Sequence, residues 1–359
     1  MDDLVSVLQL IEKAHGLPNA CYIDTDMHAK EADAIFKQGW AAIGFGCDVP
    51  KPGCVYPIDM LGIPLLMVRT KNDEVHVFEN VCRHRGMILV EEPAQLNGPI
   101  TCPYHAWSYD LEGHLKATPH VGGPNIHKDE TVICESLSLN RVRSVVWRDV
   151  VFVNLSGTAA PFDMIAHPLR DRWSEFEKPI FGGGADSMFS LEVDCNWKLA
   201  VENYCEAYHL PFIHPGLNSY SRLEDHYNIL DEEIYAGQGS YVYKPQLDED
   251  GRCFPVFEGL TDKWDTAAEY CAFFPNVLFG VEQKETSIST ARIRLAPGMR
   301  AHTYLPRRPW QSTCCVCALQ RSGARRRLPH VKPGQAAPVQ GASRTHTWPG
   351  RQTGRRAGR

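Results

Sequence analysis

The sequence has no acidic residue after Glu285, although 43 Asp and Glu precede that point in a chain of 359 residues. Residues 286–359 hold 15 of the 37 Lys and Arg, which gives this part a charge of +15. Residues 1–285 hold the other 22 against 43 acidic residues, a net charge of −21. One folded polypeptide rarely divides its charge in this way. We therefore expect 286–359 not to continue the preceding domain.

Other common signals are missing as well. The chain starts Met1-Asp2-Asp3, without the basic and apolar regions of a signal peptide. No run approaches the roughly 18 to 20 apolar residues that a membrane-spanning helix needs. No GxGxxG fingerprint follows a predicted strand, so a dinucleotide-binding motif of that type is absent. The 13 cysteines lack the pattern of a secreted disulfide framework, and we expect buried thiols or metal ligands. These absences favour a cytoplasmic protein that does not contact a membrane.

Hydrophobic periodicity divides the chain into four parts. Helical spacing of apolar residues predicts helices over 2–15 and about 27–38. Short β-branched runs at 65–68 and 75–78, with further runs up to 154, predict a small all-β domain. A helix is expected around 197–210 and one buried strand over 273–281. The expected parts are N-terminal helices (1–39), an all-β domain (40–157), a second domain (158–285) and a disordered Pro- and Arg-rich tail (286–359).

The all-β part contains two Cys/His pairs. Cys82-Arg83-His84 is followed, after 17 residues, by Cys102-Pro103-Tyr104-His105. A Rieske [2Fe–2S] centre needs two thiolates on one iron and two imidazoles on the other. Each pair can sit on a tight loop and present one ligand to each iron, and Gly86 allows a sharp turn after the first pair. The same ligand types also suit tetrahedral zinc, so the spacing alone leaves a zinc site open.

The residues around the two pairs favour the cluster. Cys82-Arg-His-Arg-Gly86 and Cys102-Pro-Tyr-His-Ala-Trp-Ser-Tyr-Asp-Leu-Glu-Gly113 closely resemble the two ligand loops of the Rieske non-haem iron oxygenases. The resemblance implies that Trp107 and Tyr109 shield the cluster from solvent. The implied cluster ligands are Cys82, His84, Cys102 and His105.

A second motif begins at Asn196-Trp197-Lys198 and continues through Glu202, Glu206, His209 and His214. On one continuous helix, Glu202, Glu206 and His209 would share a face. Pro211 would then end the helix and let His214 turn back toward His209. Two neutral imidazoles and a carboxylate form the facial triad of non-haem Fe(II) oxygenases. Taken alone, the two histidines could equally be ordinary side chains at a helix end.

The whole pattern N-W-K-x3-E-N-x2-E-x-Y-H-x4-H resembles the iron site of the same family and follows the Rieske motif in the family's order. The resemblance implies that His209 and His214 bind mononuclear Fe(II). It also makes Glu206 the bridging carboxylate, which hydrogen-bonds a Rieske histidine of the neighbouring subunit and carries electrons between the centres. The functional unit implied is a homotrimer.

The resemblance also carries expectations about fold and activity. It implies an α+β fold, with an all-β Rieske domain and a helix-grip-like catalytic domain of antiparallel sheet and helices. It implies the oxygenase (alpha) subunit of a ring-hydroxylating mono- or dioxygenase that oxidises a small organic substrate with O2. A separate reductase, directly or through a ferredoxin, would supply electrons from NAD(P)H.

The substrate is less defined, because the family contains aromatic-ring hydroxylases and oxygenases of quaternary ammonium compounds such as carnitine, choline or betaines. Glu206 and the N-x-x-E-x-Y-H spacing look more like the ammonium branch. Aromatic side chains can cage a trimethylammonium group by cation–π attraction, but they can equally form a core or line a pocket for a benzene ring. The candidates are Tyr204, Tyr208, Phe212, Tyr220, Phe273 and Phe274.

The family pattern breaks at the third iron ligand, an Asp well beyond the histidines. Five acidic residues remain in the later region, and none has the context of that ligand: Asp262, Asp265, Glu269, Glu282 and Glu285. The simplest hypothesis is that the reading frame changes near 281–300 and replaces the rest of the catalytic domain, which re-reading the coding DNA would test. The alternative function is an inactive remnant that keeps only the Rieske cluster. A basic arm for nucleic acid is disfavoured, because aromatic residues are sparse in the tail.

Overall fold

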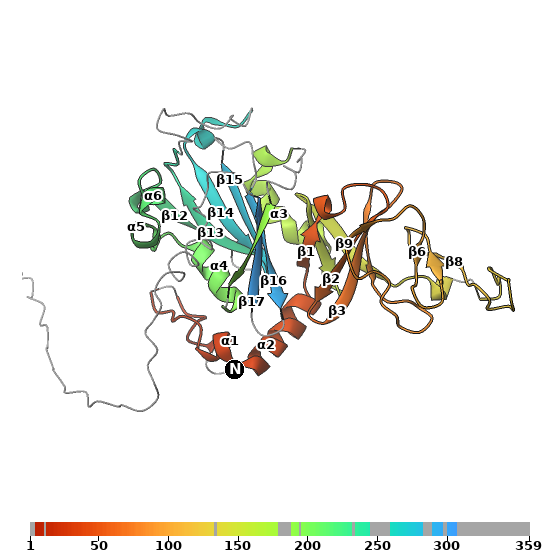
Figure 1. Ribbon diagram of the computed structural model, residues 1–359. Helices are drawn as coiled ribbons and strands as arrows, with labels where there is room; N and C mark the ends of the chain where they lie inside the picture. The colour runs from red at the N-terminus through yellow and green to blue at the C-terminus, as the bar shows by residue number, and fades with distance from the viewer. Residues whose placement is uncertain are drawn as a thin grey trace, which may run out of the picture.

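The computed structural model describes residues 4–10, 12–132, 135–178, 188–193, 195–231, 234–244, 259–282, 289–296 and 300–306, with backbone only for 188–193, 289–296 and 300–306. Its strands form two seven-stranded sheets and one three-stranded sheet, and helices pack beside the second large sheet (Figure 1). The pairs within these sheets are antiparallel. The predicted α+β fold, with an all-β part and an antiparallel sheet joined to helices, is therefore confirmed.

The first sheet has the order β1-β10-β9-β4-β3-β2-β5, and the small sheet has the order β6-β7-β8. The predicted strand–turn–strand at 65–78 is the hairpin of β3 and β4, with its turn at 70–74. The strands of these two sheets are β1 (Ala41–Phe45), β2 (Cys54–Met60), β3 (Ile63–Arg69), β4 (Val75–Glu79), β5 (Ala94–Gln95), β6 (Ile100–Thr101), β7 (Ser108–Tyr109), β8 (Leu115–Ala117), β9 (Arg141–Trp147) and β10 (Val150–Asn154). Short 3-10 turns lie at Gly46–Asp48 and Glu135–Leu137.

The second sheet has the order β11-β17-β16-β15-β14-β13-β12. Its strands are β11 (Met188–Val193), β12 (His226–Leu230), β13 (Tyr235–Ser240), β14 (Ala268–Phe273), β15 (Val277–Glu282), β16 (Ser289–Ala296) and β17 (Arg300–Pro306). The buried strand predicted over 273–281 is in fact the end of β14, a turn and most of β15, and the prediction overlooked the turn signal of Pro275-Asn276.

Two strands of this sheet lie beyond residue 285, so the predicted end of the catalytic domain was too early. β16 pairs with β15 from Ser289 onward, and β17 pairs with both β16 and β11. The prediction gave weight to the change in charge and overlooked the alternation of polar and apolar residues over Arg292–Leu295, which suits a strand. The remainder of the predicted tail, residues 307–359, lies outside the described residues.

The helices are short. They are α1 (Ala20–Ile23), α2 (Thr25–Glu31), the π-helix η2 (Ala32–Lys37), α3 (Phe162–Arg172), α4 (Trp197–Cys205), α5 (Leu210–Ile213) and α6 (Pro215–Asn218), with 3-10 turns at Ser174–Phe176, Leu223–Asp225 and Asp262–Asp265. α2 and η2 correspond to the helix predicted over 27–38. No helix among the described residues is long and apolar enough to span a bilayer.

The helix predicted over 2–15 does not form in the described residues of that segment, which make turns instead. Its apolar stripe is only partly covered, since Leu4 and Val7 are half-buried and Leu8 is 84% exposed. A short amphipathic helix gains most of its stability from the packing of such a stripe.

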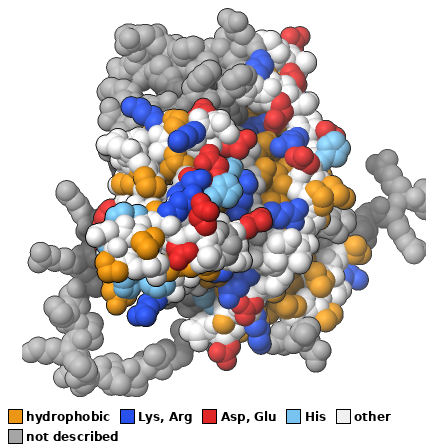
Figure 2. Space-filling view, turned by 90° about the vertical axis from the view of Figure 1, so that its right-hand side faces the viewer, with side chains coloured by type: hydrophobic (Ala, Val, Ile, Leu, Met, Phe, Trp, Pro, Cys, Tyr) orange, Lys and Arg blue, Asp and Glu red, His pale blue; other side chains and the backbone are white. Residues whose placement is uncertain are grey.

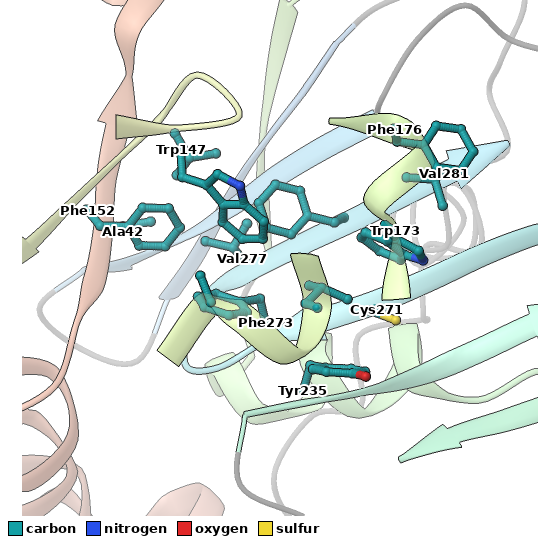
Figure 3. Packing of buried hydrophobic residues seen from close by; sticks show 14 of the residues in the cluster. Ala42, Trp147, Phe152, Trp173, Phe176, Tyr235, Cys271, Phe273, Val277 and Val281 are labelled. Carbon is teal, nitrogen blue, oxygen red and sulfur yellow. The ribbon is translucent and has the colours of Figure 1, made fainter. Parts of the chain in front are cut away.

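The two large sheets share one core of aromatic side chains (Figure 3). Trp147 of β9 lies edge-on to Phe273 of β14 and Phe279 of β15, with ring centroids 5.4 and 5.3 Å apart. Beside this contact, the Asn276 amide donates to the Ala42 carbonyl and accepts from the Ala42 N–H, both at 2.9 Å. Asn276 thus pairs with the edge strand β1 as a neighbouring strand would, which fixes the sheets relative to each other.

Candidate metal centres

Two loops of the same backbone form carry the four predicted cluster ligands. In each loop the Cys N–H donates to the carbonyl five residues later, at 2.8 Å for both Cys82 and Cys102. Each Cys carbonyl accepts from the N–H four residues later, at 2.9 and 3.0 Å. That fourth position is left-handed in both loops, with φ of 74° at Gly86 and 56° at Ala106. The sharp turn predicted at Gly86 is therefore present, and Ala106 makes its counterpart.

The two loops bring their side chains together. The His84 and His105 rings have centroids 4.8 Å apart, and both cysteines are 2% exposed. The Nδ1 atoms of His84 and His105 are buried and have no hydrogen-bond partner in the described part of the chain. Burial, with His105 and Arg85 nearby, lowers the pKa of His84 and favours its neutral form. Buried unpaired nitrogens are costly, so this arrangement fits a group that binds imidazole lone pairs. The assignment of the four ligands stays a prediction.

Trp107 and Tyr109 pack against the first ligand loop. Trp107 stacks on His84 with ring centroids 4.6 Å apart and planes 6° apart, and Tyr109 is fully buried. The Tyr109 hydroxyl lies 3.4 Å from Cys82 Sγ and accepts the Arg83 N–H at 3.1 Å. These positions agree with the predicted shielding, and the contact to Cys82 Sγ is a role that the sequence did not indicate.

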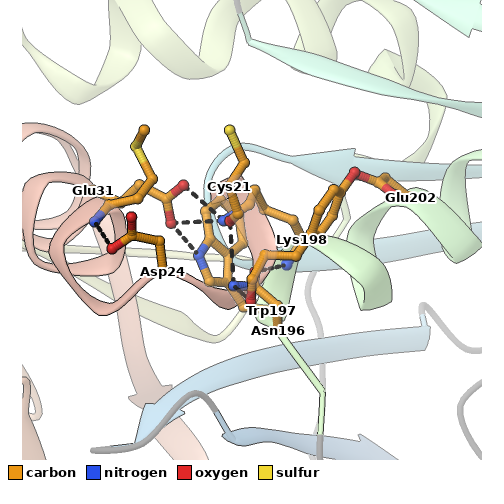
Figure 4. Close-up of polar contacts among 9 residues, drawn as sticks. Cys21, Asp24, Glu31, Asn196, Trp197, Lys198 and Glu202 are labelled. Carbon is orange, nitrogen blue, oxygen red and sulfur yellow. Dashed lines mark hydrogen bonds and ion pairs between the residues drawn. The ribbon is translucent and has the colours of Figure 1, made fainter. Parts of the chain in front are cut away.

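Asn196-Trp197-Lys198 starts and anchors helix α4. Asn196 caps the helix by accepting the Lys198 N–H at 3.1 Å. Lys198 Nζ lies 2.7 Å from both carboxylate oxygens of Glu31, and the Trp197 indole donates to the same carboxylate at 3.2 Å (Figure 4). The Lys198 and Glu31 side chains are only 10% and 12% exposed.

A second tether joins α4 to the N-terminal helices. The Tyr22 hydroxyl donates to Glu202 at 2.6 Å, and the Asn196 amide donates to the Tyr22 carbonyl at 3.0 Å. The segment around Tyr22 and Glu31 thus positions the helix that leads to the second motif. No spacing rule could have found these partners, because Tyr22 and Glu202 are 180 residues apart.

The predicted continuous helix through Glu206 and His209 is wrong. α4 ends at Cys205, and Glu206 has extended backbone with φ −130° and ψ 157°. The Cys205 thiol donates to the Ala236 carbonyl at 3.4 Å and so draws the helix end onto β13. Burial raises the pKa of this thiol to about 11, which keeps the proton that it donates. Pro211 lies in the first turn of α5, where its missing N–H costs nothing, and so does not end a helix.

His209 and His214 nevertheless meet, with ring centroids 5.2 Å apart and planes at 75°. Glu206 contacts the Nδ1 atom of His209 and accepts the His209 backbone N–H at 3.2 Å. A proton on Nδ1 faces the carboxylate and places the imidazole lone pair on Nε2. The Nε2 atom of His214 is buried without a hydrogen-bond partner among the described residues. Burial, then the neighbouring His209, lowers the pKa of His214 and favours the neutral form. Two such imidazoles fit a metal ion.

No described group of three or more His, Cys, Asp or Glu side chains surrounds a single ion position. Of the later acidic residues, Asp262 and Asp265 are exposed. Glu269 is fully buried and receives hydrogen bonds from Arg172, Trp173, Tyr227 and Lys263. Glu282 accepts from the Tyr270 hydroxyl at 3.3 Å, and Glu285 lies outside the described residues. The described part of the chain therefore supplies two iron-ligand candidates and no third.

Family models match both regions of the chain. Residues 39–134 match the Rieske [2Fe-2S] domain, and residues 184–304 match the ring hydroxylating alpha subunit (catalytic domain). The chain thus carries the two domain types that occur together in the Rieske non-haem iron oxygenases. The two domain types of the family imply a Rieske [2Fe–2S] cluster and a mononuclear iron. The second match also extends past residue 285, in agreement with β16 and β17.

Curated relatives include a glycine betaine monooxygenase oxygenase subunit from Chromohalobacter salexigens, 29% identical over 62% of this chain and 49% of the relative. Choline monooxygenase of Arabidopsis thaliana is 27% identical over 75% of this chain and 62% of the relative. The chain thus spans about half to three fifths of the length of these relatives.

Solved structures share the fold of this chain. The quaternary ammonium Rieske monooxygenase CntA has a TM-score of 0.64 at 20% identity, covering 82% of this chain and 75% of CntA. Naphthalene 1,2-dioxygenase from Rhodococcus sp. has a TM-score of 0.63 at 18% identity, covering 82% of this chain and 73% of that enzyme.

Proposed function

We propose that this chain is the oxygenase component of a Rieske oxygenase, with Cys82, His84, Cys102 and His105 holding the cluster. His209 and His214 would hold the mononuclear iron, and Glu206 would fix the tautomer of His209. The observation that carries the proposal is the pair of adjoining imidazoles, one with its Nδ1 on a carboxylate and the other with a buried, unpartnered Nε2 in the described part of the chain. When bound, the iron supplies O2 activation, with electrons from the cluster and ultimately from an NAD(P)H-dependent reductase, directly or through a ferredoxin.

Electron transfer between subunits, in a homotrimer, is part of this proposal. The β6–β8 end that carries the ligand loops and the α5–α6 end that carries the histidines lie on opposite sides of the molecule (Figure 1). Both ends expose aromatic side chains, since Tyr104 is 59% exposed beside His105 and Phe212 is 73% exposed beside His214. Around the β6–β8 end, charged, histidine and hydrophobic side chains are mixed on one face (Figure 2). Such a face suits a protein partner.

We also propose a quaternary ammonium substrate, in preference to an aromatic ring. Four tyrosines follow one another on the sheet face toward α4, in the order Tyr220, Tyr243, Tyr270 and Tyr204, with neighbouring ring centroids 5.7, 6.3 and 6.1 Å apart. The buried Glu282 accepts from one of them and adds negative charge. Tyrosine faces and a carboxylate both attract a cation. The similarity to oxygenase subunits for glycine betaine and carnitine supports the same substrate class.

Only two of the six aromatic side chains predicted for an ammonium cage, Tyr204 and Tyr220, belong to this group. Tyr208 and Phe212 are 75% and 73% exposed, Phe273 lies in the shared core, and Phe274 is 47% exposed. The sequence did not single out Tyr243 and Tyr270. Tyr270 lies in β14 opposite Gln238 of β13, and Tyr243 follows β13 and donates its N–H to the Thr266 carbonyl just before β14, so contacts between distant segments bring the two together.

The experiment is an iron and acid-labile sulfide count on anaerobically purified protein, followed by binding of glycine betaine, carnitine and naphthalene. We expect about three irons and two sulfides per chain. Tighter metal binding or a changed spectrum at the mononuclear site would support the substrate class if an ammonium compound causes it and naphthalene does not. Response to naphthalene alone would overturn it.

The second candidate function is an inactive remnant that retains only the electron-transfer cluster. The observation that favours it is the lack of a third carboxylate beside His209 and His214 in the described residues. About two irons and two sulfides per chain, with no response to either substrate class, would select this alternative.

A further inference from the structure

A buried chain of polar side chains lies on the β12–β13 hairpin, on the face toward α4. Antiparallel pairing places His226 of β12 opposite Ser240 of β13, and Gln238 projects from the same face two residues before Ser240. Gln238 Oε1 lies 2.8 Å from His226 Nδ1, and Ser221 Oγ lies 3.0 Å from His226 Nε2. Ser221, Gln238 and Ser240 are 2%, 6% and 0% exposed.

The two ends of this group of side chains reach the segments on either side of the histidine pair. At one end, the Gln238 amide donates to the Tyr204 carbonyl at 3.4 Å, in the last turn of α4 and two residues before Glu206. At the other end, Ser221 follows α6, the helix that begins directly after His214, and its N–H donates to the Leu217 carbonyl at 3.0 Å. Within this group of polar side chains, His226 contacts both Gln238 and Ser221 through its two ring nitrogens.

The hydrogen-bond partners define the proton positions. The Gln238 NH2 group is used on the Tyr204 carbonyl, so its oxygen faces His226 and must accept from Nδ1–H. The His226 Nε2 atom lies 3.0 Å from the Ser221 hydroxyl oxygen. The Ser221 hydroxyl donates to Ser240 Oγ at 3.1 Å, and Ser240 in turn donates to the Val242 carbonyl at 2.9 Å. Burial, opposed by the Gln238 contact, lowers the pKa of His226, in keeping with a neutral ring.

We propose that His226 is a positioning residue for the His209–His214 site, acting through Gln238 on the end of α4 and through Ser221 on the segment after His214. This inference rests on the proposed metal site, and it adds a residue that touches neither the metal nor substrate. His209 and His214 flank the short helix α5, so the position of this pair relative to Glu206 and α4 depends on tethers outside α5. The hairpin supplies one tether on each side of α5 from a single side chain.

The test uses the full chain with its cluster oxidised and therefore EPR-silent, and Co(II) as the probe of the His209–His214 site. Binding to this site is assigned by its loss in His209→Ala. We expect His226→Phe, which keeps the ring and removes both hydrogen bonds, to weaken Co(II) binding by about tenfold and to change the EPR spectrum of the bound ion. His226→Asn can still donate to Gln238, so it should recover part of the affinity, and Gln238→Leu should resemble His226→Phe.

The matched control is Tyr227→Phe, on the next residue of β12. It removes one buried hydrogen bond, to Glu269 at 2.7 Å on the other face of the sheet, and has no link to the histidine segments. It should lower the melting temperature as His226→Phe does and leave Co(II) affinity and the EPR spectrum unchanged. Equal Co(II) affinity in wild type and His226→Phe, or an equal loss in Tyr227→Phe, overturns the positioning role alone. Failure of the wild type to bind Co(II) at this site overturns the proposed metal site, and the positioning role with it.

Discussion

The two metal regions of this protein are held in opposite ways. The four cluster-ligand candidates lie between residues 82 and 105, on two loops whose key hydrogen bonds close within each loop. His209 and His214 flank the short helix α5, and the preceding helix α4 is held by Tyr22, Glu31 and Gln238, which are distant in the chain. The first site should therefore tolerate damage elsewhere in the molecule, whereas the second should respond to changes in several distant segments.

The largest expected effect comes from removing a cluster ligand. Cys82→Ser should abolish the visible absorbance and acid-labile sulfide of the cluster, because serine does not replace a buried thiolate on iron. Co(II) binding at the histidine pair should persist. Loss of both metals in this variant would argue against independent sites.

The reverse experiment is His214→Ala. It should remove at least about tenfold of the Co(II) affinity at the mononuclear site, since one of two imidazoles is lost. The cluster should keep its absorbance and its sulfide. Bleaching of the cluster by this change would show that the regions are coupled within one chain.

Glu31→Ala tests the tether of α4. It leaves Lys198 buried without its carboxylate, and the free energy of unfolding should fall by about 3 kcal/mol. Weaker Co(II) binding should accompany this loss, with no change in the cluster. The control is Asp33→Asn in the same helical segment. Asp33 pairs with Lys37 at a surface position, 69% and 37% exposed, and the change should cost less than about 1 kcal/mol.

The smallest effects concern the two matched loop positions. Gly86→Ala should cost about 1 kcal/mol, from the left-handed backbone alone, because a Cβ there meets nothing within 4 Å. Ala106→Gly should stabilise by about 0.5 kcal/mol, after the greater chain entropy of unfolded glycine is subtracted. Thermal melts of both variants measure the difference, and opposite signs are the expected outcome. If both substitutions changed the free energy of unfolding in the same direction, the two loops would not be equivalent.

This contrast explains which parts of the structure were predictable. The cluster loops, the β3–β4 hairpin and the helix over 25–37 follow from short-range patterns, so the sequence predicted them well. The break in the helix before Glu206 was missed, because it depends on contacts of Cys205 with Ala236, 31 residues away, and of Tyr204 with Gln238, 34 residues away. The tyrosine series and His226 were missed for the same reason, since packing of α4 and the connecting segments on strands β12 to β14 brings them together. The change in charge predicted a domain boundary at residue 285, but strands β16 and β17 beyond it belong to the same sheet.

The pairing of β11 has a consequence for how the chain can fold during synthesis. β12 to β16 pair with their neighbours in sequence, so each can join the sheet soon after it leaves the ribosome. β11 is made first, but its partner in the sheet is β17, and Met188 pairs with Pro306. More than a hundred residues must be translated before this contact can form. Loop closure over that distance is entropically costly and slow. Until then both edges of β11 are unpaired, and its protection from other nascent chains depends on how quickly translation reaches residue 306.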